Sequence, residues 1–152
     1  TMEMEMVQIE GVDSTNRNTI AKVAKGANLV VRERLMTSGD QVAVSAYTVE
    51  LSGDGAGADV VSRSVAKNDS RQTFESRIIG DCACTGHTEC DAIIMDHAKI
   101  AAIPSLEANH VDAALVHEAA IGKIAGDQII KLMTLGLTEK EAEEQIIAGF
   151  LK

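Results

Sequence analysis

The sequence has few of the large aromatic side chains around which most globular cores are built. Its 152 residues include no Trp, one Tyr and two Phe. Because 45% of the residues are nonetheless hydrophobic, Val, Ile, Leu, Ala and Met must fill the interior, which favours thin, regular packing. With one Pro and 12 Gly, the composition is neither collagen-like nor disordered, so we expect a folded unit the size of one domain.

Basic residues are also in the minority, with 14 Lys and Arg against 23 Asp and Glu and a net charge of −9. This charge repels nucleic-acid phosphates and anionic lipids. No run approaches the roughly 18 apolar residues that span a bilayer, and the first residues carry Glu where a signal peptide carries Lys or Arg. We therefore expect a cytoplasmic protein that binds neither nucleic acid nor membranes.

From residue 2 to about residue 120, short apolar runs alternate with polar residues and predict many short strands. Turn-forming residues interrupt them at 37–40 and 52–58. Pairs of β-branched residues begin at Val60, Ile78 and Ile93, at intervals of 18 and 15 that approach one coil of a β-solenoid. A flat antiparallel sandwich would have similar strands, but the scarcity of aromatic residues favours the solenoid.

The periodicity becomes helical after about residue 121. Apolar residues at 129–133 have helical spacing, Gly136 is placed as a C-terminal cap, and Thr138 with Glu141 forms a capping-box pattern. In the second helix Ala142, with residues 146 and 150, is expected on one face. We expect a helical hairpin that buries one stripe against the β part.

The cysteines and one histidine form the pattern C-x-C-x2-H-x2-C with Cys82, Cys84, His87 and Cys90. Thiolate and imidazole are ligands for zinc and for iron–sulfur clusters, so one metal site is possible chemically. An odd number of clustered cysteines does not suit a secreted disulfide framework. Alternatively, Cys82 and Cys84 are small hydrophobic residues on one buried face of a strand.

The adjacent His117 and Glu118 are a second candidate pair. Neighbours in a strand point to opposite faces, so both could serve one site only if the strand ended or bent there. The alternative is a surface or edge pair. His97 and His110 have no neighbouring pattern, and we assign them no role.

Several elements follow one another in a characteristic order: a Cys-Asp before an apolar run, a Pro about a dozen residues later, a His-Glu-Ala element and a Gly-containing helical hairpin. In this order and spacing, about residues 76–150 resemble the SufB/SufD family of iron–sulfur cluster assembly proteins. Residues 1–70 resemble it only as generic β-solenoid sequence. The matching elements are Cys90-Asp91 with residues 92–95, Ile103-Pro104, residues 116–124 (VHEAAIGKI), residues 127–137 and residues 141–150, preceded by residues 70–72 and Gly80.

The resemblance implies a mainly β fold: a right-handed parallel β-helix followed by a small C-terminal helical hairpin. We expect the β-helix segment at residues 1–120 and the helical segment at residues 121–152, where the family's ATPase docks. Members usually have more β-helix coils, so we expect either the C-terminal part of a longer protein or a minimal member. We also expect a second copy or a partner to cover the first strand.

The resemblance further implies no catalytic residue but a scaffold site for persulfide or iron, formed by Cys90, His117 and Glu118. A thiolate can carry sulfur or ligate iron, and His and Glu are harder ligands that allow its release. Cys82, Cys84 and His87 are possible additional ligands without a family role. SufD-like members often have Gly in place of Glu118, so the chain resembles SufB; Val116 stands where an acidic residue can precede the His.

The implied function is a SufB-like scaffold that assembles a transient iron–sulfur cluster with a SufC-type ABC ATPase. The sequence has no G-x-x-x-x-G-K-[ST] loop, so the partner would hydrolyse ATP. Sulfur would come from a cysteine desulfurase system, and a second SufB- or SufD-type subunit would pair through the β-helix; the sequence assigns no flavin. The alternatives are a SufD-like adaptor that holds no cluster, a β-solenoid enzyme, whose repeats or basic catalytic residues are missing, and a structural zinc protein.

Overall fold

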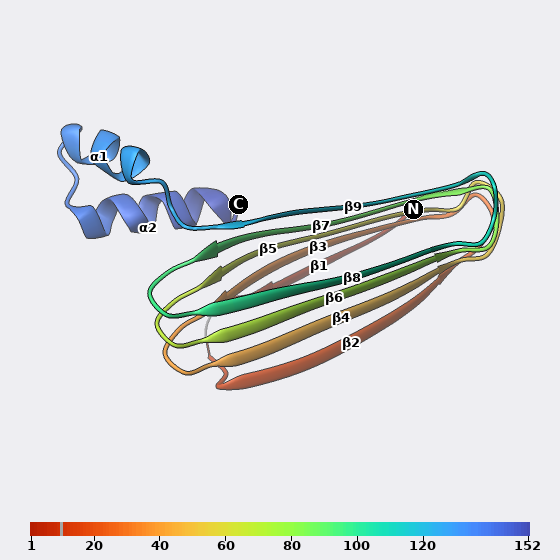
Figure 1. Ribbon diagram of the computed structural model, residues 1–152, viewed down its shortest axis with the longest axis horizontal. Coiled ribbons are helices and arrows are strands. Elements are labelled where there is room, and N and C mark those ends of the chain that lie inside the picture. The colour runs from red at the N-terminus through yellow and green to blue at the C-terminus, as the bar shows by residue number, and fades with distance from the viewer. Residues whose placement is uncertain (10) are drawn as a thin grey trace.

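The computed structural model describes residues 1–9 and 11–152, which form nine strands followed by two helices. Figure 1 shows the strands as two stacked layers, with the helices at one end. The strands are β1 (Met2–Gln8), β2 (Ser14–Val23), β3 (Asn28–Thr37), β4 (Val42–Leu51), β5 (Gly57–Ala66), β6 (Arg71–Gly80), β7 (Cys84–Ile94), β8 (Lys99–Ala108) and β9 (Ala113–Gly122); the helices are α1 (Gly126–Thr134) and α2 (Glu139–Phe150).

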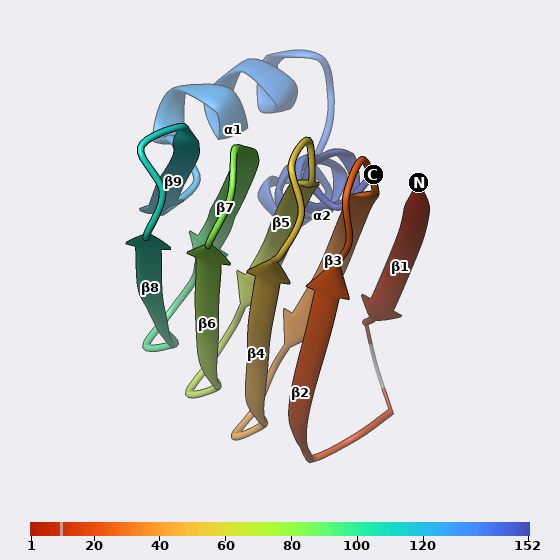
Figure 2. The ribbon, with the colours of Figure 1, turned by 90° about the vertical axis from the view of Figure 1, so that its right-hand side faces the viewer.

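The strands alternate between two parallel sheets along the chain. One sheet, here called sheet A, has the order β1-β3-β5-β7-β9, and the other, sheet B, has the order β2-β4-β6-β8. Each strand therefore pairs with the next but one, and the chain winds as a solenoid, whose successive coils lie side by side in Figure 2. All strand pairings are parallel, which confirms the predicted β-solenoid and rules out the antiparallel sandwich.

The length of a coil differs from the one that the sequence suggested. Val31 pairs with Val60 and Val60 with Thr88, so stacked positions lie 29 and 28 residues apart. The intervals of 18 and 15 between Val60, Ile78 and Ile93 instead join successive strands, which belong to opposite sheets. The interpretation of these intervals as coils was wrong because one coil contains two strands and two turns.

The interior is built mainly from aliphatic side chains, as the composition predicted. Tyr47 and Phe74 form one tilted aromatic pair, with ring centroids 5.8 Å apart. The sequence analysis did not predict that polar side chains would also be buried in this interior. The largest fully buried side chains are Leu51, Ile78, Val31, Val49, Val60, Val65, Thr88, Cys90 and Ser70.

A buried carboxylate lies inside the solenoid. Glu33, on β3, is 3% exposed. Its Oε1 accepts hydrogen bonds from Arg17 Nη1 at 2.9 Å, Ser45 Oγ at 2.6 Å and Tyr47 OH at 3.1 Å, and its Oε2 accepts one from Ser62 Oγ at 2.7 Å. These donors replace the water that the carboxylate loses on burial.

Capping residues mark the start of α2 and the end of α1. Thr138 caps α2, and the reciprocal hydrogen bonds of its capping box with Glu141 confirm that prediction. Gly136, at φ +100°, ends the α1 turn in a backbone conformation that L side chains rarely adopt. Neither helix has the length and apolar character that crossing a membrane requires in the described part of the chain.

The hairpin touches the solenoid through α2. Ala142 and Ile147 are its buried residues, whereas the expected Ile146 and Phe150 are only half-buried. Every residue of α1 stays at least partly exposed. A groove between the two parts is lined from the solenoid by Val7, Ile9, Arg34, Met36 and Lys67, and from the helical end by Glu144, Ile147, Ala148 and Leu151.

Candidate functional site

Cys90 lies on β7 with its side chain in the interior of the solenoid, where it is 1% exposed. Along sheet A it pairs with Ser62 on β5 and with Ala119 on β9. Burial raises the pKa of its thiol to about 11, and the carboxylates of Asp91 and Glu33 add to this increase. At neutral pH the side chain is therefore a protonated thiol, which is a weaker ligand and nucleophile than a thiolate.

The other two cysteines are also buried and free. Cys84 begins β7, and Cys82 lies in the turn before it, where its Sγ contacts the Leu51 carbonyl oxygen at 3.3 Å. Burial, with a contribution from Cys84, raises the pKa of Cys82. Both thiols belong to the hydrophobic cluster of the interior, as expected if they act as small hydrophobic residues.

The structure does not bring the C-x-C-x2-H-x2-C donors to one point. His87 and Cys90 are an odd number of positions apart on β7, so their side chains point to opposite faces of sheet A. The three thiols are buried, whereas the His87 side chain is 33% exposed on the outer face.

His117 lies on β9 and shares its inward face with Leu115, which packs against the core. It pairs with Thr88, two positions before Cys90 on the neighbouring strand. Its Nδ1 is buried without a hydrogen-bond partner among the described residues. Burial lowers the pKa of this imidazole, and the nearby His87 lowers it further, so the His117 side chain is neutral at neutral pH.

Glu118 points away from the interior and is 66% exposed. Strand β9 continues through this position to Gly122, so the adjacent His117 and Glu118 lie on opposite faces. A single site that contained both His117 and Glu118 would need the strand to bend or end here, so it is not formed within one chain. Cys90 and His117 share the interior, and Glu118 belongs to the outer surface of the same sheet.

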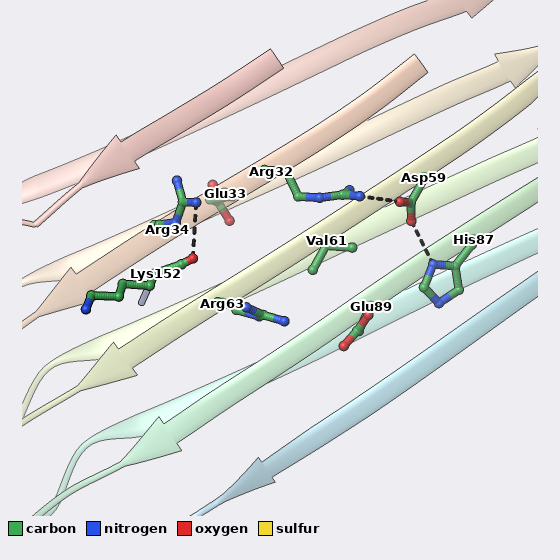
Figure 3. Close-up of a pocket in the computed structure, with 9 residues that line it drawn as sticks. All are labelled: Arg32, Glu33, Arg34, Asp59, Val61, Arg63, His87, Glu89 and Lys152. Atoms are coloured by element: carbon green, nitrogen blue, oxygen red, sulfur yellow. Dashed lines mark hydrogen bonds and ion pairs between the residues drawn. The ribbon is translucent and has the colours of Figure 1, made fainter. Parts of the chain in front are cut away.

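On that outer surface Glu118 meets a group of charged side chains, part of which Figure 3 shows. The His87 Nδ1 lies 2.8 Å from Asp59 Oδ1, and its Nε2 lies 3.4 Å from Glu118 Oε2. Arg32 Nη2 donates to Asp59 Oδ2 at 2.7 Å. His87, Glu89 and Glu118 offer ligand atoms that all lie within 4.8 Å of one another.

The pKa values in this group follow from these contacts. The hydrogen bond with Asp59 raises the pKa of His87 against the effect of burial, and Glu118 adds to the increase. Burial opposes ionisation of Asp59, but hydrogen bonds from His87 and Arg32 lower its pKa overall. The side chain of Asp91, which lies two positions after Glu89 in the sequence, raises the pKa of Glu89. The group thus gathers several carboxylates around one imidazole.

Asp59, Glu89 and Glu33 were missed by the sequence analysis. Glu89 lies two positions after His87, and strand alternation could have placed both on one face. Asp59 lies 28 residues before His87, and only the register of β5 against β7 brings the two side chains together. The register therefore carries the information that the linear pattern lacks.

Comparison with known proteins identifies the family. The model of the SufBD core domain of the SUF system for FeS cluster assembly matches residues 1–150. The chain belongs to the SufBD family. The expected resemblance is thereby confirmed, and it extends over the N-terminal residues that resembled the family only in style.

Curated SufBD relatives come from archaea and bacteria. An iron–sulfur cluster assembly SufBD family protein of Methanothermobacter thermautotrophicus is 38% identical over 74% of this chain and 28% of its own length. A Pyrococcus horikoshii SufBD family protein is 32% identical over 99% of the chain and 42% of its own length. The Bacillus subtilis iron–sulfur cluster assembly protein SufB is 32% identical over 61% of the chain and 21% of its own length. The chain therefore spans less than half the length of these relatives.

Proposed function

We propose that this SufBD chain is a SufB-like scaffold on which a nascent iron–sulfur cluster is assembled. The observation that carries the proposal is the shared interior position of Cys90 and His117 on neighbouring strands of sheet A. A thiol and an unpartnered imidazole nitrogen thus lie near each other on the neighbouring strands β7 and β9. Together they supply the soft and borderline ligands that suit sulfur and iron.

Cluster assembly at this site requires the Cys90 thiol to lose its proton. Its burial and raised pKa mean that a local rearrangement around β7, or a bound metal, would accompany loading. The neighbouring strand β9 pairs on one side only, as β1 does at the other end of sheet A. Glu118, on the outer face, supplies a harder ligand for iron delivered from solvent.

The proposal includes two protein partners. A SufC-type ABC ATPase would dock on the helical hairpin, where Ile130, Met133 and Leu135 of the α1 region are exposed. A second SufB- or SufD-type subunit would pair at the open end of the solenoid, where Ile103 and Leu106 are exposed on β8. ATP hydrolysis would belong to the ATPase, and this chain would act as a scaffold rather than an enzyme.

The remaining components of the proposal follow from the same function. A cysteine desulfurase system would supply sulfur, and ferrous iron and the cluster would be cargo. We place the protein in the cytoplasm, in keeping with its acidic composition and with the absence of any membrane-spanning helix among its described residues.

A SufD-like adaptor is the second candidate, and the burial of Cys90 favours it. A thiol that is 1% exposed and has a pKa of about 11 is poorly suited to sulfur transfer in this conformation. Such an adaptor would still pair with a scaffold subunit and dock the ATPase.

Anaerobic co-purification with the ATPase, followed by iron and sulfide quantification, separates the two candidates. We expect wild type to hold iron and sulfide after reconstitution and Cys90→Ser to lose most of both. Cys82→Ser is the control, because Cys82 is also a buried free thiol but lies outside the proposed site. ATPase binding without iron or sulfide in wild type would instead support the adaptor, and unchanged reconstitution of Cys90→Ser would contradict the assignment of Cys90.

A further inference from the structure

The outer face of sheet A carries two adjacent rungs of ionisable residues. Asp59 on β5 pairs with His87 on β7, and Glu89 on β7 pairs with Glu118 on β9. Alternation along β7 puts His87 and Glu89 on the same face, so the rungs are neighbours. Two glutamates directly opposite each other on neighbouring strands repel unless a cation lies between them.

We propose that His87, Glu89 and Glu118 bind one divalent transition-metal ion of the ferrous type on this outer face. The His87 Nε2 and one carboxylate oxygen from each glutamate would be the protein ligands. Water or a small donor would complete the coordination, since one imidazole and two carboxylates leave further positions open.

The distances suit a single ion. Ligand atoms at about 2.1 Å from a tetrahedral metal lie about 3.4 Å apart, which is the separation of His87 Nε2 and Glu118 Oε2. The three candidate atoms already lie within 4.8 Å of one another. Glu118 is 66% exposed and free to rotate, so its carboxylate can close the remaining distance without moving the backbone.

Asp59 is a positioning residue for this site. An ionised carboxylate only accepts hydrogen bonds, so the 2.8 Å contact requires His87 Nδ1 to carry a proton; in the neutral ring the lone pair is then on Nε2, which faces Glu118. Arg32 holds Asp59 in turn through a 2.7 Å ion pair, visible in Figure 3. A carboxylate that orients a histidine in this way is the usual second partner of a metal-binding imidazole.

The site is separate from the interior residues of the proposed scaffold. Cys90 lies on the opposite face of β7, and His117 points inward from β9. The metal site is therefore inferred from its own geometry. The proposed function adds only a role for it, as a binding site for iron close to the cluster site. If Cys90→Ser left cluster reconstitution unchanged, the assignment of Cys90 would be wrong, but the metal site would be unaffected.

Binding can be measured without any cluster chemistry, with Co²⁺ by calorimetry and with Fe²⁺ by anaerobic equilibrium dialysis, both without sulfide. We expect one ion per chain. His87→Gln, Glu89→Gln and Glu118→Gln should each weaken binding by about 100-fold, and Asp59→Asn by about 10–100-fold while leaving all three ligands in place. Cys90→Ser should bind as wild type does.

Two matched controls and one direct readout complete the test. His97→Gln and Glu75→Gln remove the same groups from exposed positions elsewhere and should bind as wild type does. Substoichiometric Co²⁺ should broaden the imidazole NMR signals of His87 before those of His97 and His110. Signals from His97 or His110 broadening first, or unchanged affinity in His87→Gln with native circular dichroism, would show that the group forms ion pairs only and would overturn the proposal.

Discussion

Replacing Arg17 with methionine should destabilise the protein because it leaves the buried carboxylate of Glu33 without its only cationic partner among the described residues. Removing one member of a fully buried pair typically costs about 3–5 kcal/mol. Here three hydroxyl groups still donate to Glu33, and the Arg17 side chain is 30% exposed. We therefore expect a smaller loss of about 2–3 kcal/mol in the free energy of unfolding.

The reverse change supplies the second arm of a double-mutant cycle. Glu33→Gln removes the charge but keeps one accepting oxygen, and it should cost about 1.5–3 kcal/mol. Introducing Glu33→Gln into the Arg17→Met background should cost at least about 1 kcal/mol less than in wild type, because no unpaired charge remains buried.

Urea unfolding followed by circular dichroism measures these differences, with equal m-values as the check on a common unfolding transition. Arg77→Met is the control, since the Arg77–Glu107 pair lies on the surface and its loss should cost no more than about 1 kcal/mol. If Arg17→Met destabilised the protein no more than Arg77→Met, or if the two changes at Arg17 and Glu33 were additive, the description of Glu33 as a charge held by a buried network would be refuted.

Three further predictions address single features. All three thiols should react slowly with a disulfide reagent in the native protein and rapidly in denaturant. At neutral pH the thiolate fraction of Cys90 should be about one hundredth of that of a thiol with the ordinary pKa of 9.0. Rapid labelling of Cys90 in the native protein would contradict its burial. Thr138→Ala should cost about 1 kcal/mol by removing the α2 cap. The hydrogen bonds from Thr138 lower the pKa of Glu141, so the contribution of the ionised Glu141 carboxylate should be complete above its ordinary pKa of 4.5 and be lost as the pH falls through the lowered folded-state pKa. In a pH titration of helicity, the difference between wild type and Thr138→Ala should therefore shrink at acidic pH to the part that comes from the hydrogen bond between the Glu141 N–H and the Thr138 hydroxyl, and a constant difference at all pH values would contradict this. Gly53→Ala should cost about 1–3 kcal/mol, because the added Cβ would lie 2.4 Å from the Lys25 backbone nitrogen; an unchanged melting temperature would contradict the close approach of the two turns.

Local structure was predicted well from the sequence where the pattern involves residues that are close together in the chain. The alternation at residues 42–51 corresponds to β4, and the capping box at Thr138 begins α2 as expected. The parallel stacking of the coils is confirmed, although the interval of 28 or 29 residues was hidden because one strand of the opposite sheet and two turns separate each pair of stacked positions.

The interior charge was unpredictable for a different reason. Glu33 falls on the same face as Leu29, Val31 and Leu35, but Arg32, Glu33 and Arg34 are three consecutive charged residues, and a hydropathy pattern gives no reason to bury a charge among them. Tertiary partners decide it: Arg17, Ser45 and Ser62 come from β2, β4 and β5 and are joined to Glu33 only by the fold. The same holds for Asp59 and His87 in the outer group.

For the adjacent residues His117 and Glu118 on β9, the number of strand residues before the pair matters as much as the chemistry of the two side chains. One dipeptide places an imidazole in the interior through His117 and a carboxylate on the solvent-exposed face through Glu118. Deleting a single residue between positions 113 and 116 would exchange the two, turning the carboxylate inward and the imidazole outward, without altering either side chain. The length of the strand ahead of the pair thus constrains both proposed sites, and a chain that kept both residues but changed this length by one would be expected to lose both at once.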